Sequence, residues 1–397
     1  MLNKKTGIIF FVVFQSCVSS ARQEPVTQEA SPVRPAAEDQ AMYVPLLKGK
    51  NFAITTNHTA VIGSVHLVDS LVISGLAPKK IFSPEHGYRG TDADGVTIKN
   101  TKDPGTGIPI VSLYGKKKKP DPEDLSDIDL MIYDIQDVGV RFYTYISTLH
   151  YVMEACAENQ IPLVILDRPN PLGFYTDGPV LDPSFKSFVG MEPVPIVYGL
   201  TVGELAGMIN GEGWLGNNLR CDLKVIRCSG YTHKSRYRLP VNPSPNLLNM
   251  EGIYLYPSVA LFEGTMMNVG RGTPFSYQVF GHPDYPGHHF SYTPRASSVN
   301  SSPKHMNQLC YGFDLRSIHP DSLRTFSRIN LSWLIDAYKT MKRTDFFLPF
   351  MNNLAGTDQL RKQIETGTSE EEIRKSWEPG LAKYRQLRKK YLLYPEL

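Results

Sequence analysis

The chain has 397 residues, and its 42 Lys and Arg residues nearly balance its 39 Asp and Glu residues, which leaves a formal net charge of only +3. This balance does not indicate a nucleic-acid-binding protein, and the dense basic run 116–119 between Gly115 and Pro120 is typical of a solvated loop. A chain of this length exceeds one ordinary core and favours two domains, at about 100 to 200 residues each.

The amino terminus has the layout of a secretory signal. Lys4 and Lys5 precede the apolar run 8–14, and small and polar residues follow around Cys17. Cys17 also resembles a bacterial lipoprotein processing site, so lipidation and plain secretion both stay open. We expect a leader over 1–23, a flexible tether over 24–43, and a place in the bacterial cell envelope, either as a periplasmic or outer-membrane lipoprotein or as a secreted protein. No later apolar run is long enough to span a bilayer, so contact with a membrane is expected only through an N-terminal lipid anchor.

From Asn51 onward, short apolar strands alternate with helical stretches. Helices are predicted at 65–74, at 144–159 and, behind a capping box of Thr201 and Glu204, up to 209. Strands are predicted at 52–56, 80–83, 108–113, 130–133, 163–166, 195–198 and 223–226. This alternation predicts an α/β fold, a Rossmann-like, mostly parallel sheet covered on both faces, over 44–284. A smaller α+β C-terminal auxiliary domain is predicted over 285–397, with helices at 331–341 and after the capping pair Ser369 and Glu372.

Ligands of such sheets bind outside the carboxyl ends of the strands, and these ends carry many polar residues here. The second strand runs into the segment IFSPEHGYRG, where Pro84, Gly87 and Gly90 prevent a regular continuation. One polar residue at a strand end is usually a helix cap or a loop ion pair, but four strand ends together indicate a site. The candidates are Asn57 after the first strand, Glu85 and His86 after the second, Asp134, Gln136, Asp137 and Arg141 after the fourth, and Asp167, Arg168 and Asn170 after the fifth.

The sequence lacks the motifs of the common cofactor and nucleophile sites. The turn after the first strand reads TTNHTAVIGS, without a glycine-rich phosphate loop, and neither a GxSxG elbow nor an HExxH helix is present. Residues 301–304 match SxxK but lie in a polar loop, and the histidines between 282 and 289 are interrupted by Pro and Gly. We therefore predict neither a metal nor another cofactor.

Carboxylates, amides, aromatic rings and arginines around one cleft suit glycoside hydrolysis. That reaction needs one protonated carboxyl group to donate to the leaving oxygen and one carboxylate to act as nucleophile or base. Tyr143 and Tyr145 could pack on sugar faces, and an arginine could pair with an acidic substituent of the substrate. These residue types alone leave other functions open.

Several longer segments resemble the NamZ-like exo-β-N-acetylmuramidases, a family of glycoside hydrolases formerly described as a domain of unknown function. The resemblance runs from about Asn51 to the carboxyl terminus. It implies release of terminal β-linked N-acetylmuramic acid from the non-reducing ends of peptidoglycan fragments, and a site in the cleft between a Rossmann-like domain and a smaller C-terminal domain. The segments are SPEHG (83–87), YDIQDVGVRFYTYISTL (133–149), LDRPNPLG (166–173), PSPN (243–246), LFEGT (261–265), GRGT (270–273), LAGTDQLRKQIE (354–365) and SWEPGLAKYRQLRKKYLLY (376–394).

The same resemblance implies roles for individual residues. The glutamate of the EHG motif falls on Glu85, the expected catalytic acid, and Asp137 or Glu263 is the leading candidate for the second carboxylate, ahead of Asp134 and Asp167. The lactyl carboxylate of muramic acid needs a cation, for which Arg141, Arg168 and Arg271 are candidates. Tyr198 and Phe174 depart from residues common in the family and are expected beside the cleft. The complete set expected to bind substrate is Asn57, His86, Asp134, Gln136, Arg141, Tyr145, Asp167, Arg168, Asn170, Asn246 and Arg271.

Two other functions remain open at this level. A tethered lipoprotein could bind wall sugars without cleaving them, and another wall hydrolase, an amidase or esterase, could use similar residues. Replacing Glu85 by Gln discriminates between a binder and a hydrolase, because a binder should keep most of its affinity whereas a hydrolase should lose its turnover.

Overall fold

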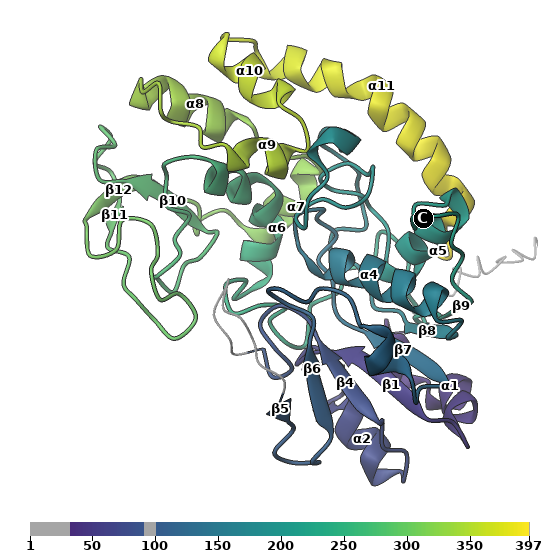
Figure 1. The fold of residues 1–397 in the computed structure, drawn as a ribbon. Helices are drawn as coiled ribbons and strands as arrows, with labels where there is room; N and C mark the ends of the chain where they lie inside the picture. The colour runs from purple at the N-terminus through teal and green to yellow at the C-terminus, as the bar shows by residue number, and fades with distance from the viewer. Residues whose placement is uncertain (1–31, 91–100, 397) are drawn as a thin grey trace, which may run out of the picture. The chain divides into compact units, whose positions relative to one another are not determined.

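A seven-stranded sheet organises the first half of the chain in the computed structural model, which describes residues 32–90 and 101–396 (Figure 1). The strand order is β5-β6-β4-β1-β7-β8-β9, and every neighbouring pair is parallel except the edge pair β5 and β6. Because successive parallel strands are added outward from β1 on both sides, the sheet is doubly wound, and the predicted Rossmann-like class is confirmed. The strands are β1 (Phe52–Thr56), β4 (Lys80–Ser83), β5 (Thr101–Lys102), β6 (Pro109–Ser112), β7 (Leu130–Asp134), β8 (Leu163–Leu166) and β9 (Leu223–Ile226).

Both faces of this sheet are buried, as expected for strands that are apolar throughout. Successive side chains of a strand point to opposite faces. Ala53 and Met131 belong to the hydrophobic cluster that includes α4 (Tyr145–Glu158) and α5 (Val202–Glu212). Ile54 and Ile132 belong to a second cluster with α1 (Gln40–Leu47) and α2 (Leu67–Ile73). The helices therefore hold the strand ends in fixed positions from both sides.

The predicted starts of the main helices follow from their caps. At α5, Thr201 Oγ1 accepts from the Glu204 amide at 3.2 Å and the Glu204 carboxylate accepts from the Thr201 amide at 2.9 Å, which confirms the capping box. Helix α2 begins later than predicted, because Val65 and His66 form β3 (Val65–His66), which pairs with β2 (Val61–Ile62). The short α3 (Pro122–Leu125) and η2 (Pro183–Phe185) lie in the connections.

The segment 32–43, predicted as part of the tether, is packed into the fold. It contains η1 (Ala36–Glu38) and the start of α1. Ala37 and Tyr43 are fully buried, and the Tyr43 hydroxyl donates to the Ala37 carbonyl at 2.9 Å. The small alanines allow the backbone to lie against the sheet, where the Ala36 amide donates to the Asp167 carbonyl at 2.9 Å. The predicted leader, Cys17 and the first part of the tether lie outside the described residues.

The strand predicted at 195–198 is absent from the sheet. Val197 forms only isolated bridges, one to Val140 and one to Asp177. The apolar side chains of residues 195–198 are buried because this segment lies between two loops. A segment buried in this way has the same apolar sequence pattern as a buried strand.

The second half of the chain combines a small sheet with a group of helices, as the predicted α+β class requires. The sheet has the order β10-β12-β11 and is antiparallel, so it includes residues on both sides of position 284. Ser369 caps the long helix α11 (Glu370–Arg388) in the predicted capping box, and α11 is the long yellow helix of Figure 1. The remaining elements are α6 (Met250–Val259), η3 (Ala260–Gly264), β10 (Val279–His282), β11 (Ser291–Tyr292), β12 (Cys310–Asp314), α7 (Pro320–Phe326), α8 (Ser332–Met341), α9 (Phe350–Ala355), α10 (Gln359–Glu365) and η4 (Lys389–Tyr391).

None of the helices within the described ranges is both long and apolar enough to cross a membrane.

Candidate active site

A cavity of ≈ 610 Å³ is formed by loops from both halves of the chain. Its lining includes Glu85, Glu263 and Arg271, which come from far-apart segments of the sequence. All three were predicted to take part in catalysis or substrate binding. The volume is in the range of sites for small organic ligands, about 300 to 1,000 Å³. The other residues used below that line it are His86, Tyr114, Tyr143, Thr144, Tyr145, Phe188, Asn246, Asn268, Tyr277, Asn300, Ser301 and Lys304.

Glu85 is presented by a tight turn directly after β4. His86 has a φ of 67° and Gly87 a φ of 74°, so two successive residues adopt the left-handed conformation. This conformation is costly for a residue with a side chain, and such strain concentrates at functional sites. The Thr144 hydroxyl, at the start of α4, donates to Glu85 Oε2 at 2.6 Å and fixes the carboxyl group.

Glu263 lies on η3 and is held by two side chains of the following loop. Arg271 Nε is 2.8 Å from Glu263 Oε1, and the Tyr277 hydroxyl donates to the same oxygen at 3.2 Å. Burial raises the pKa of Glu263 to about 7, the negative charge of Glu85 raises it as well, and Lys304 and Tyr277 oppose the shift. A pKa close to the working pH suits a group in acid or base catalysis.

Lys304 places a cation beside Glu263. Its ammonium group donates to the carbonyl oxygens of Glu263 at 2.9 Å and Thr265 at 2.5 Å. Burial lowers the pKa of Lys304 to about 8, an effect that Glu263 opposes and Arg271 strengthens. The SxxK match at 301–304, which was predicted to be a polar loop, thus lies in the cavity wall. There Lys304 donates hydrogen bonds to backbone carbonyl groups.

Two tyrosines expected to face sugars also hold the cavity wall. The hydroxyls of Tyr143 and Tyr145 donate to the Pro243 carbonyl at 2.7 and 3.3 Å, and the two rings meet edge to face at 4.8 Å. This anchors the PSPN loop, where Asn246 accepts a hydrogen bond from the Asn300 amide at 2.6 Å. Tyr145 and Asn246 therefore line the cavity as predicted, but most of the Tyr145 ring is buried in the protein.

Asp137, the other leading candidate for the second carboxylate, does not line the cavity. Its carboxylate is buried and accepts hydrogen bonds from the Gly139 amide at 2.6 Å and from the Tyr198 hydroxyl. Burial raises the pKa of Asp137 to about 6, and these hydrogen bonds oppose the shift. Tyr198 is buried behind the cavity, and Phe174 packs on Tyr254 with ring centroids 6.4 Å apart, so neither residue lines the cavity as expected.

The remaining strand-end residues stabilise the fold instead of lining the cavity. The fully buried Arg141 guanidinium donates to four backbone carbonyl groups, those of Pro179, Val194, Leu354 and Ala355. Arg168 forms a buried ion pair with Asp134, at 2.9 Å between Nη2 and Oδ2. Gln136, Asp167 and Asn170 likewise bond to neighbouring loops, through the Pro169 carbonyl, Thr201 with Tyr394, and the Leu200 carbonyl respectively. Asn57 accepts a hydrogen bond from the Thr59 hydroxyl within its own turn. Strand ends collect polar residues here because the loops that leave the sheet need buried hydrogen-bond partners.

Replacing Arg168 with Met tests this structural role. The Arg168 side chain is 1% exposed and that of Asp134 is fully buried, so the variant leaves an uncompensated buried carboxylate. We expect the free energy of unfolding, measured by urea denaturation, to fall by about 3 to 5 kcal/mol. Replacing Arg361 with Ala, which breaks the exposed pair with Glu365, should cost no more than about 1 kcal/mol. A normal unfolding curve with a raised substrate KM in the Arg168 variant would instead make Arg168 a substrate ligand.

Among the cavity residues that contact Glu85 or Glu263, the sequence did not indicate Thr144, Tyr277 and Lys304 as functional residues. Thr144 lies inside the quoted string FYTY but has no motif of its own, and Tyr277 carries no sequence signal. Lys304 was visible only in the SxxK match. Among residues 32–90 and 101–396, no group of three or more His, Cys, Asp and Glu side chains is arranged to hold a metal ion.

Comparisons with known proteins assign the chain to a family. The family model of the N-terminal part of the exo-β-N-acetylmuramidase NamZ matches residues 52–251, and that of its C-terminal part matches residues 254–394. The peptidoglycan β-N-acetylmuramidase NamZ of Bacillus subtilis (strain 168) is 36% identical, over 98% of both chains.

Two solved structures from Bacteroides fragilis NCTC 9343, both described as DUF1343 family proteins, have the same fold. One is 47% identical, with a TM-score of 0.86, over 92% of this chain and 99% of the other. The second is 28% identical, with a TM-score of 0.74, over 91% of this chain and 99% of the other. With both family models matched in sequence order along one chain, the protein belongs to the NamZ exo-β-N-acetylmuramidase family.

Proposed function

We propose that this protein is an exo-acting glycoside hydrolase that releases terminal β-linked N-acetylmuramic acid from the non-reducing ends of peptidoglycan fragments. The observation that carries the proposal is the meeting of two carboxyl groups, Glu85 and Glu263, in one cavity of a chain from the NamZ family. Two carboxyl groups that flank the scissile bond are the usual requirement for glycoside hydrolysis.

The family resemblance implied that Glu85 is the catalytic acid, but the electrostatics of the cavity favour Glu263 in that role. A general acid needs a raised pKa, and burial gives Glu263 a pKa of about 7. Glu263 would donate its proton to the glycosidic oxygen as the bond to the leaving sugar breaks. Glu85, which accepts a hydrogen bond from Thr144, would act as the carboxylate at the anomeric carbon, either directly or through a water molecule. If Glu85 attacks directly, Glu263 regains its proton from the water that hydrolyses the glycosyl-enzyme bond; if Glu85 instead activates a water molecule, Glu85 takes the proton of that water and releases it to solvent, from which Glu263 is reprotonated.

The cavity also offers cations for the lactyl carboxylate that distinguishes muramic acid from glucosamine. Of the three arginines considered from the sequence, Arg271 alone lines the cavity, and Lys304 lies next to it. The two carbonyl oxygens bonded to Lys304 leave one of its three N–H donors for a ligand. A charge-assisted hydrogen bond from Lys304 or Arg271 to the lactyl group would favour the muramide over the glucosaminide.

The test is release of para-nitrophenol from a β-linked para-nitrophenyl N-acetylmuramide, compared with the matched N-acetylglucosaminide. We expect turnover of the muramide and little turnover of the glucosaminide, because only the muramide carries the lactyl carboxylate. Turnover of neither compound, with normal binding of muramyl saccharides by calorimetry, would identify a wall-sugar binding protein instead. Cleavage of an amide or ester bond in muropeptides, with the glycosidic bond intact, would identify a different wall hydrolase.

We also propose that the protein acts in the cell envelope, tethered by a lipid on Cys17 or secreted. The support is the signal-like sequence before Cys17. Metabolic labelling with a radioactive fatty acid, which a Cys17→Ala variant should not incorporate, tests lipidation.

A further inference from the structure

A second cavity, of ≈ 470 Å³, lies at the carboxyl-terminal end of α11 and shares no lining residue with the first. Its wall is unusually rich in cations. The lysines and arginines are Arg385, Arg388 and Lys389 at the end of α11, and Lys234 from a distant loop, and the single carboxylate of the lining is Glu396, near the end of the chain. The lining residues are Gly173, Phe174, Tyr175, Thr176, His233, Lys234, Ala382, Arg385, Gln386, Arg388, Lys389 and Glu396.

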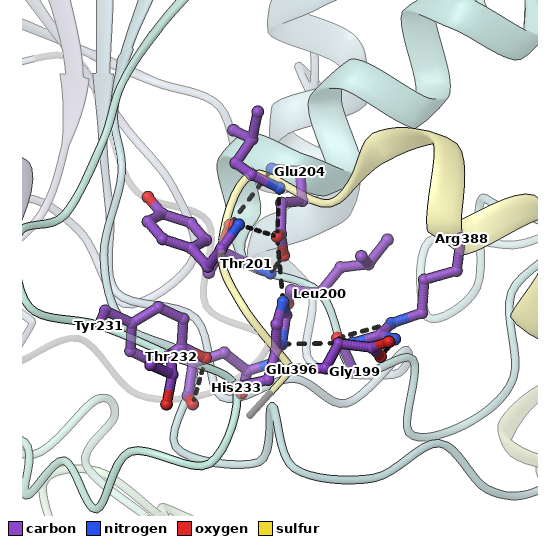
Figure 2. A network of polar contacts seen from close by, with 12 residues as sticks. Gly199, Leu200, Thr201, Glu204, Tyr231, Thr232, His233, Arg388 and Glu396 are labelled. Carbon is purple, nitrogen blue, oxygen red and sulfur yellow. Dashed lines mark hydrogen bonds and ion pairs between the residues drawn. The ribbon is translucent and has the colours of Figure 1, made fainter.

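Three residues of the lining, His233, Arg388 and Glu396, belong to one hydrogen-bond network (Figure 2). Arg388 is only 6% exposed, and its Nε and Nη2 donate to the Gly199 carbonyl at 2.9 and 2.7 Å. Nη2 also lies 3.3 Å from His233 Nδ1, which must accept because a guanidinium only donates. His233 Nε2 therefore carries the hydrogen and donates to the buried Glu204 carboxylate at 3.0 Å. The network fixes the position of the buried guanidinium before any ligand arrives.

The Arg388 guanidinium already has a carboxylate partner within the chain, Glu396. Glu396 Oε1 contacts Arg388 Nη1, and this hydrogen bond lowers the pKa of Glu396, so the group is ionised at neutral pH. The Glu396 side chain is about half exposed, which means that it approaches Arg388 from the solvent side. The cavity thus binds one anionic group from within the chain.

Among the described residues, none of the other lining lysines and arginines lies within 4 Å of the Glu396 carboxylate, although the charge of Lys389 acts on it at longer range. Arg385 donates to Thr176 Oγ1 at 3.1 Å and lies 3.2 Å from the exposed Glu378. In the described part of the chain, the ammonium groups of Lys234 and Lys389 have no ion-pair partner within 4 Å. Cations gathered around a concave wall attract anions more strongly than the same charges spread over a flat surface.

We propose that this cavity is a second ligand site, for a small polyanion such as a phosphorylated sugar or a polycarboxylate, and that Glu396 is its internal competitor. A ligand would place one anionic group on Arg388, in exchange for Glu396, and a second between Arg385 and Lys389. Tyr175 supplies aromatic surface for the body of the ligand, whereas the Phe174 ring is covered by the Arg324 guanidinium, 4.1 Å from the ring centroid. Phosphorylated sugars and polycarboxylates share the required chemistry, which is two or more negative charges on a molecule about the size of a sugar.

Isothermal titration calorimetry at constant ionic strength tests the site with three probes: glucose 6-phosphate, citrate and glucose. We expect saturable binding of at least one of the two anions and none of glucose, and the anion that binds more tightly identifies phosphate or carboxylate as the preferred group. The double variant Arg385→Ala/Lys389→Ala should weaken binding about tenfold or more, as loss of charge-assisted hydrogen bonds predicts. The Glu396→Gln variant should tighten binding, because the competing charge is gone.

Two controls place the binding in this cavity. Lys383→Ala removes an exposed cation of the same helix that does not line the cavity, and Arg271→Ala removes a cation of the first cavity, so both should leave the affinity unchanged. Equal weakening in the Lys383 variant would reduce the effect to general charge attraction, and loss in the Arg271 variant would move it to the first cavity. Absence of binding at millimolar concentrations, or weaker binding in the Glu396→Gln variant, would overturn the proposal. None of these outcomes depends on hydrolysis, so the result is independent of the proposed glycosidase activity.

Discussion

Replacing Glu85 with Gln is expected to lower kcat for muramide hydrolysis by at least about 10² to 10⁴-fold, the range for loss of a catalytic acid or base. Glutamine keeps the shape of the side chain and can still accept the hydrogen bond from Thr144, but it cannot act as a carboxylate. Steady-state kinetics with the para-nitrophenyl muramide measure the effect, and urea denaturation should show a free energy of unfolding changed by less than about 1 kcal/mol.

The matched control for this variant is Glu251→Gln on α6. Glu251 does not line the cavity, so kcat should stay within about twofold of the original value. If the Glu85 variant retained activity within tenfold, Glu85 would not be one of the two catalytic carboxyl groups.

Replacing Glu263 with Gln is expected to separate good leaving groups from poor ones. A sugar hydroxyl needs a proton when it leaves, whereas para-nitrophenolate leaves almost without one. A muramyl disaccharide should therefore lose about 10² to 10⁴-fold in kcat, while the para-nitrophenyl muramide loses far less. Equal losses for both substrates would show that Glu263 is not the acid.

The pH dependence of disaccharide hydrolysis provides a second test of Glu263 as the catalytic acid. Because burial raises the pKa of Glu263 to about 7, the protonated fraction of Glu263 falls as the pH rises through 7. If the protonated form is required, hydrolysis of the disaccharide declines above about pH 7, and the Glu263→Gln variant lacks this decline. A rate that instead increases through pH 7 would make Glu263 the base and return the acid role to Glu85.

The sheet was predictable because buried parallel strands leave a strong signal. Strands such as 163–166 are continuous apolar runs bounded by polar loops, and they appear at the predicted positions. The segment 195–198 has the same local pattern, but its partners are two loops, and local sequence does not reveal which segment an apolar run will contact. The packing of residues 36–43 was missed for the converse reason, because short alanine contacts carry little periodicity.

The candidate site was only partly predictable. The turn around Glu85 was predictable because Pro84, Gly87 and Gly90 interrupt regular structure there. Glu263 became a candidate only through the family resemblance. The strand-end rule also selected Asp134, Arg141 and Arg168, which serve the interior of the fold. Whether a polar strand-end residue faces a cavity or a neighbouring loop depends on the path of distant segments, and only the structure gives that path.

The boundary between the two matched family regions, residues 251 to 254, falls within helix α6. Glu85 belongs to the first region and Glu263 to the second, so a continuous helix, not a flexible linker, connects the parts that carry them. A helix resists bending, unlike the loops that act as hinges when domains close on a substrate. A relative movement of the two regions would therefore have to bend this helix, and bending is easiest at Pro257, which removes one backbone hydrogen bond inside α6.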